Sequence, residues 1–188
     1  MTPYDFVQLA LHAAGGKIQG RTKLQKTVYF LGLITGNLDD LGYQAHYYGP
    51  YSAEVAEAVS TLEGIGFASS TVASVGSLDP QGFEIRRSDY ALTEEGTRAA
   101  ERKAITHPAL FQRLREGVEL LRRAGDLDYV RLSIAAKAYF LLRQKNAPVN
   151  EHELPLLART FGWAVSEQQI RDGLEYLRRL NLSQPVPA

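Results

Sequence analysis

Residues 52–96 read SAEVAEAVSTLEGIGFASSTVASVGSLDPQGFEIRRSDYALTEEG, and this stretch decides the fold. Ser52 can begin a helix, because its hydroxyl can accept a hydrogen bond from a free backbone N–H of the first turn. Apolar residues then recur three or four positions apart, at Val55, Val59, Leu62 and Ile65, which predicts an amphipathic helix. Two alternating segments rich in β-forming residues, 67–75 and 83–92, are joined by a turn with Asp-Pro and two glycines. They predict a β-hairpin.

Two further helices are expected before this stretch. Pro3–Ala14 precedes a pair of glycines and predicts the first helix. Thr22 can cap a second helix, in which Leu24, Val28 and Leu31 fall on one face. The alternating segment Tyr43–Tyr48 predicts a short strand. Three helices followed by a hairpin is the order of a winged helix, which we expect over residues 1–105.

The second half of the chain is expected to be helical. Apolar positions recur at helical spacing in four segments, Pro108–Arg123, Tyr129–Gln144, Asn150–Phe161 and Ser166–Leu180. Tyr129–Gln144 is apolar over most of its circumference and is predicted to be the central buried helix.

The division of the chain follows from these segments. We predict a mainly α fold with a small β-hairpin (α+β), in which a winged-helix-type domain over 1–105 precedes a helical domain over 106–188. The apolar spacing after Ser52 repeats after Ser166. The repeat indicates either a second helix-turn-helix-like unit or simply the spacing of any amphipathic helix.

The distribution of charge is the main clue to partners. The formal net charge is zero, yet no lysine or arginine occurs between Lys26 and Arg86. The same span holds seven acids, Asp39, Asp40, Glu54, Glu57, Glu63, Asp79 and Glu84. In a winged helix the third helix is the usual reader of the DNA major groove. Its acids here would repel phosphates, so recognition of DNA through this helix is not expected.

Three motifs occur in a fixed order along the chain. They are GRTKLQKTVYFL at residues 20–31, YYGPYS at 47–52 and YALTEEG at 90–96. With these motifs the chain resembles the YwgA-like family and, more distantly, the Panacea/SocA-type antitoxin domains, over about residues 15–100. The YwgA-like resemblance implies a fold rather than an activity. The resemblance to the antitoxin domains implies neutralisation of a toxin by direct protein contact.

The preferred hypothesis is a non-enzymatic regulatory protein that binds a partner protein, antitoxin-like or adaptor-like. The predicted partner-binding residues are Tyr47, Tyr48, Tyr51, Glu54 and Glu57. Tyrosine is enriched at the hot spots of protein interfaces. Two other interpretations stay open, in which these tyrosines either pack the turn or stack on nucleic-acid bases. A homodimer built on the helical half would be compatible with each of these functions.

The alternative function is a DNA-binding transcriptional regulator. It would use basic residues that flank the acidic helix, Lys17, Arg21, Lys23, Lys26, Arg86 and Arg87. Lys23 and Lys26 are three positions apart and are expected on one outward helix face. A glycine-rich loop that leads into a helix N-terminus can also hold phosphate. Equally, these side chains could form a solvated face or ion pairs with the acidic span.

Motifs for catalysis are missing from the sequence. The four histidines, His12, His46, His107 and His152, are scattered, and no nucleotide-binding or nucleophile motif occurs. Without cysteine there is neither a disulfide nor a thiolate zinc site. We therefore expect no enzyme activity, no cofactor and no metal. No apolar run approaches the roughly 20 residues of a membrane span, so the protein is expected in the cytoplasm.

Overall fold

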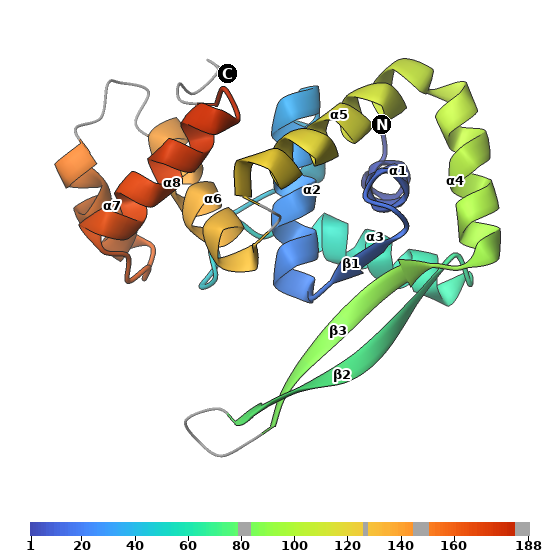
Figure 1. The fold of residues 1–188 in the computed structure, drawn as a ribbon, viewed down its shortest axis with the longest axis horizontal. Coiled ribbons are helices and arrows are strands. Elements are labelled where there is room, and N and C mark those ends of the chain that lie inside the picture. The colour runs from blue at the N-terminus through green and yellow to red at the C-terminus, as the bar shows by residue number, and fades with distance from the viewer. Residues whose placement is uncertain (79–83, 126–127, 145–150, 183–188) are drawn as a thin grey trace.

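The computed structural model describes residues 1–78, 84–125, 128–144 and 151–182, with the backbone alone at 74–78, 84–86 and 151. The fold is mainly α-helical with a small three-stranded antiparallel sheet, as the sequence predicts (Figure 1). The described elements follow in the order α1 (Pro3–Ala13), β1 (Lys17–Gln19), α2 (Arg21–Thr35), η1 (Asp39–Leu41), α3 (Ala53–Gly64), β2 (Ala68–Leu78), β3 (Glu84–Leu92), α4 (Glu94–Thr106), α5 (Pro108–Gly125), α6 (Tyr129–Gln144), η2 (Glu151–Glu153), α7 (Leu154–Thr160) and α8 (Glu167–Arg179).

Side-chain caps define the start of several of the described helices. The hydroxyls of Thr2, Ser52, Thr93 and Ser166 each accept a hydrogen bond from a backbone N–H of the first turn. The cap of α3 at Ser52 was expected from the sequence and is confirmed. The predicted Thr22 cap is wrong, because α2 begins at Arg21 and Thr22 already lies inside the helix. Its N-cap is Gly20, whose φ of 92° is a conformation that favours glycine.

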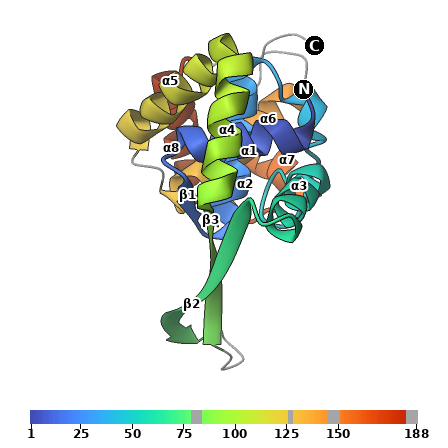
Figure 2. The same cartoon turned by 90° about the vertical axis from the view of Figure 1, so that its right-hand side faces the viewer.

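The sheet has the strand order β1-β3-β2, and both pairs are antiparallel. The hairpin β2–β3 is confirmed and extends away from the helices (Figures 1 and 2); its predicted turn, residues 76–82, lies partly outside the described residues. Strand β1 was not expected. It has only three residues, with Ile18 buried between two exposed neighbours, which is too short for a recognisable alternation.

The strand predicted at Tyr43–Tyr48 is wrong. This segment makes only one isolated backbone bridge, between Gln44 and Tyr51. Gly49 has a φ of 97° and reverses the chain immediately after the segment. The segment therefore folds back on its own continuation instead of joining the sheet.

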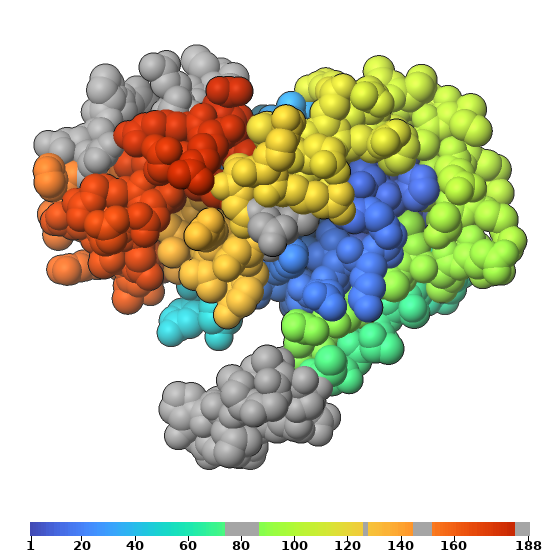
Figure 3. Space-filling model, in the orientation of Figure 1, coloured from blue at the N-terminus to red at the C-terminus, as the bar shows by residue number. Residues whose placement is uncertain are grey.

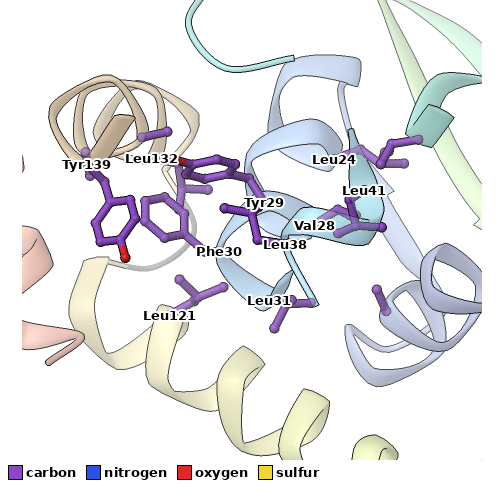
Figure 4. Close-up of a cluster of buried hydrophobic side chains, with 14 of the residues drawn as sticks. Leu24, Val28, Tyr29, Phe30, Leu31, Leu38, Leu41, Leu121, Leu132 and Tyr139 are labelled. Carbon is purple, nitrogen blue, oxygen red and sulfur yellow. The ribbon is translucent and has the colours of Figure 1, made fainter. Parts of the chain in front are cut away.

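Helix α2 is the central helix of the molecule. Every residue from Leu24 to Gly32 is buried, because α1, α3, α5 and α6 all contact this helix. Figure 4 shows Tyr29 and Phe30 extending from α2 toward Leu132 and Tyr139 of α6. The prediction that Tyr129–Gln144 is the central buried helix is wrong. Helix α6 leaves its first residues exposed, Tyr129 by 59% and Val130 by 44%.

The buried core continues from the N-terminal helices into the helical half. Residues of α1, α2 and α3 belong to the same hydrophobic cluster as residues of α5, α6 and α8. The predicted boundary at residues 105 and 106 lies at the end of α4, and the division into two domains stays a prediction. None of the described helices is long and apolar enough to cross a membrane.

Helix α4 is attached to the rest of the fold near both of its ends. The Gln8 side chain of α1 donates a hydrogen bond to the Gly96 carbonyl, and Lys103 of α4 donates to the same Gln8 amide. Gly96 also lies directly against the backbone of Phe67, where even a β-carbon would be 1.8 Å from the Phe67 carbonyl oxygen. This contact leaves no room for a side chain.

We expect Gly96→Ala to lower the free energy of unfolding by about 3 kcal/mol, because a methyl group there forces α4 away from Phe67. The matched control is Gly64→Ala, which places a methyl group on α3 where no atom lies within 4 Å. It should leave the free energy of unfolding almost unchanged. Urea denaturation of both variants measures the difference. Equal free energies of unfolding for the two variants would contradict the close packing of Gly96 against Phe67.

Candidate functional site at an exposed tyrosine turn

The segment His46–Tyr51, which we call the tyrosine turn, projects from the surface between η1 and α3 (cyan in Figure 3). Tyr47 is 70% exposed and Tyr48 is 64% exposed. Their rings meet edge to face at 4.9 Å, and the His46 ring lies 5.0 Å from the half-buried Tyr51 ring. The turn therefore presents aromatic surface to the solvent.

Helix α2 holds the backbone of this turn from inside. The Gln25 amide makes two hydrogen bonds with the backbone of Ser52, one to its carbonyl (2.9 Å) and one from its N–H (3.1 Å). The next residue, Lys26, donates from Nζ to the Pro50 carbonyl at 2.5 Å. Both side chains are buried. Two successive residues of α2 thus fix the end of the turn.

The helical half holds the start of the turn. The indole N–H of Trp163 donates to the His46 carbonyl at 2.6 Å, although the two residues are far apart in the chain. Lys137 of α6 packs on Gly49, where a β-carbon would be 3.0 Å from its Cγ. Its ammonium lies 5.7 Å from the centre of the Trp163 ring, within the range of a cation–π contact. Contacts from both halves of the chain therefore fix the turn.

The ammonium group of Lys26 is in an unusual environment. The residue is only 2% exposed, and it donates to a carbonyl oxygen rather than to a carboxylate. Burial and, to a smaller extent, the nearby charge of Lys137 lower the pKa of Lys26 to about 7. Burial also lowers the pKa of Lys137. The inner side of the turn therefore has two amines that lose their charge more easily than ordinary lysines.

The predicted acidic residues lie on the helix that follows the turn. Glu54 and Glu57 are exposed on α3. The Ser52 hydroxyl donates to the Glu54 carboxylate at 3.2 Å while it caps Val55. Ser52 thus connects the clamped end of the turn with the acidic start of α3.

The six predicted DNA-contacting residues are in different environments. Lys17 and Arg21 are exposed and Lys23 is half-buried. Lys26 is buried and bonded to Pro50, so the predicted outward face of Lys23 and Lys26 is wrong. Arg87 donates to both carboxylate oxygens of Asp89, at 2.7 and 3.1 Å. The side chain of Arg86 lies outside the described residues.

The sequence did not identify three residues that hold the turn, Gln25, Lys137 and Trp163. Gln25 and Lys26 are polar residues within the otherwise apolar run of α2, and this break in the pattern was the available signal. No local pattern connects residue 137 or 163 with the turn. In the part of the chain that the structure describes, no group of three or more His, Asp or Glu could hold a metal ion.

The pKa of Lys26 predicts a pH dependence of stability. Its folded-state pKa of about 7 lies below the 10.5 of an ordinary lysine, so between these values the unfolded chain binds more protons. The free energy of unfolding should then rise with pH through this window, and the full cost of the buried charge applies below about pH 7. Relative to Lys26→Met, wild type should gain about 2–3 kcal/mol from about pH 6 to about pH 9.

Urea denaturation of the two proteins across this pH range measures the gain, and a constant difference between them would contradict it. Lys137→Met is the control for the electrostatic cause. It removes a neighbouring positive charge, so the pKa of Lys26 should rise and the window should begin at higher pH.

Comparison with known proteins does not assign this sequence to a family. No model of a protein family matches the sequence, and no curated protein matches it.

Proposed function

We propose that this protein is a non-enzymatic regulator that acts by binding a partner protein through the tyrosine turn. The exposure of Tyr47 and Tyr48, 70% and 64%, on a turn fixed by buried side chains carries the proposal. Tyrosine rings combine a large apolar area with a hydroxyl that can form hydrogen bonds. They are over-represented among the residues that contribute most to binding energy.

The fixed backbone of the turn favours binding. A partner that docks on a mobile loop loses affinity, because ordering the loop costs conformational entropy. Here the carbonyls of His46 and Pro50 and the backbone of Ser52 are already hydrogen-bonded in one arrangement. Each tyrosine side chain has only two rotatable bonds to order. The turn is therefore pre-organised for association.

The order of the elements supports the interpretation as a winged helix. Helices α1, α2 and α3 precede the hairpin β2–β3, and β1 adds a third strand beside β3. In such a fold α3 would face DNA. Its exposed Glu54 and Glu57 disfavour phosphate and are compatible with a protein partner. The resemblance to antitoxin domains suggests a toxin as one such partner.

The alternative, binding of DNA through the flanking basic residues, has weaker support. Three of its six residues donate hydrogen bonds within the protein, Lys26 to Pro50, Arg87 to Asp89 and Arg21 to the Tyr90 hydroxyl. The described residues that keep exposed or half-buried charges without an ion pair to a described carboxylate are Lys17, Arg21 and Lys23. Replacement of these three residues tests the DNA-binding function.

The test compares a Tyr47→Ala/Tyr48→Ala double variant with Ile105→Ala. Ile105 is 79% exposed and lies on α4, away from the turn. Tagged proteins are used to capture partners from the native host with nuclease present, and the affinity for each purified partner is then measured. The double variant should bind its protein partner at least about tenfold more weakly, while Ile105→Ala binds like wild type.

Two results would contradict the proposal. One is equal affinity of the double variant and wild type for every captured partner. The other is capture that disappears with nuclease and on replacement of Lys17, Arg21 and Lys23 by glutamate, which would favour the DNA-binding alternative.

A further inference from the structure

A pocket of about 340 Å³ opens between α2, η1 and α6. Its apolar walls come from Tyr29, Leu38, Tyr43 and Phe140, and the charged groups Asp39 and Arg143 also line it. This volume is at the lower end of the range for small-molecule sites, about 300–1,000 Å³. Three aromatic rings and one guanidinium in a space of this size suit a small, flat ligand with a charged end.

The hydroxyl of Tyr29 lacks a hydrogen-bond partner within the described chain. The residue is 1% exposed, and its ring extends from α2 toward α6 (Figure 4). The neighbouring phenol of Tyr43 is satisfied, since it donates to the Gln25 carbonyl at 2.6 Å. Burial raises the pKa of Tyr29, so its hydroxyl keeps the proton and can donate. The oxygen itself has less than 1 Å² of accessible surface, so the hydroxyl is closed to an occupant of the pocket.

Arg143 supplies the charge that such a ligand would meet. Its side chain is 28% exposed and makes one contact with Asp39 at 3.3 Å, whose side chain is 86% exposed. An ion pair this open to water contributes little, so another carboxylate can replace Asp39. The guanidinium fork matches a carboxylate through two parallel hydrogen bonds.

We propose that this pocket binds a small monocarboxylic acid with a flat aromatic body. Its carboxylate replaces Asp39 at Arg143, and its ring packs on Phe140, Tyr43 and Leu38. A dianion is disfavoured, because Asp39 remains near the site. A cation is disfavoured by Arg143. This site is separate from the tyrosine turn, and the proposal does not depend on the proposed function.

Three probes of similar shape test the ligand chemistry. Benzoate, benzamide and benzylamine are titrated into the full-length protein and followed by the amide NMR signals of Tyr29, Phe140 and Arg143. Benzoate should shift these signals in a saturable way, benzamide should bind at least about tenfold more weakly because it lacks the charge, and benzylamine should not bind. Equal binding of benzoate and benzamide, or no saturable binding of benzoate, would overturn the proposal.

Variants test the residues. Tyr29→Phe removes a buried unpaired hydroxyl, so it should raise the thermal unfolding temperature without ligand. It should leave benzoate affinity unchanged, because this hydroxyl is closed to the pocket. Arg143→Gln should weaken benzoate at least tenfold, by roughly the effect of a charged hydrogen bond. Asp39→Asn should strengthen benzoate binding, because it removes the competing carboxylate. These opposite directions distinguish a binding site from general damage to the fold.

The matched control for Asp39→Asn is Glu95→Gln, which removes a carboxylate from an exposed ion pair with Arg98 on α4. It should leave benzoate affinity unchanged. Wild-type benzoate affinity in Arg143→Gln would refute the assignment of this residue.

Discussion

The burial of residues 24–32 of α2 is the constraint from which the rest of the structure follows. The long polar side chains of this segment need partners within the protein, because buried polar groups without partners destabilise the fold. Gln25 and Lys26 lie in this enclosed region. Their partners are the backbone of Ser52 and the Pro50 carbonyl. The position of the tyrosine turn is thus a consequence of how α2 satisfies its own buried groups.

The same constraint joins the two halves of the chain. Helices α5 and α6 cover α2 on the sides that α1 and α3 leave open, and Tyr29, Phe30 and Leu31 contribute to the shared core. Trp163, from the segment after α7, then reaches the turn that α2 already holds. An N-terminal fragment that lacked α5 and α6 would expose α2 and lose the Trp163 contact. In this structure the shape of the turn depends on residues far away in the chain.

Much of the fold could be predicted because it depends on local chemistry. The caps at Ser52 and Thr93, the hairpin and the exact bounds of α6 follow from neighbouring residues alone.

The environment of Lys26 could not be predicted from spacing. Its position relative to Lys23 is that of a surface pair, and only the packing of α1, α3, α5 and α6 around α2 makes it a buried group. Likewise Tyr43–Tyr48 has the alternation of a strand, but Gly49 reverses the chain before a partner strand can form. Of the candidate site, the aromatic composition was readable from the sequence, whereas Trp163 and Lys137 required the tertiary fold.

The clamps on the tyrosine turn have a shared property: each one acts on main-chain atoms. Gln25 contacts the backbone of Ser52, Lys26 the carbonyl of Pro50 and Trp163 the carbonyl of His46. None of them depends on which side chains stand at positions 47 and 48. The backbone conformation of the turn is therefore independent of the side chains that it presents to a partner. Substitution at these two positions could redirect binding toward a new partner while the scaffold stays intact, which makes the turn a natural site for evolving or engineering specificity.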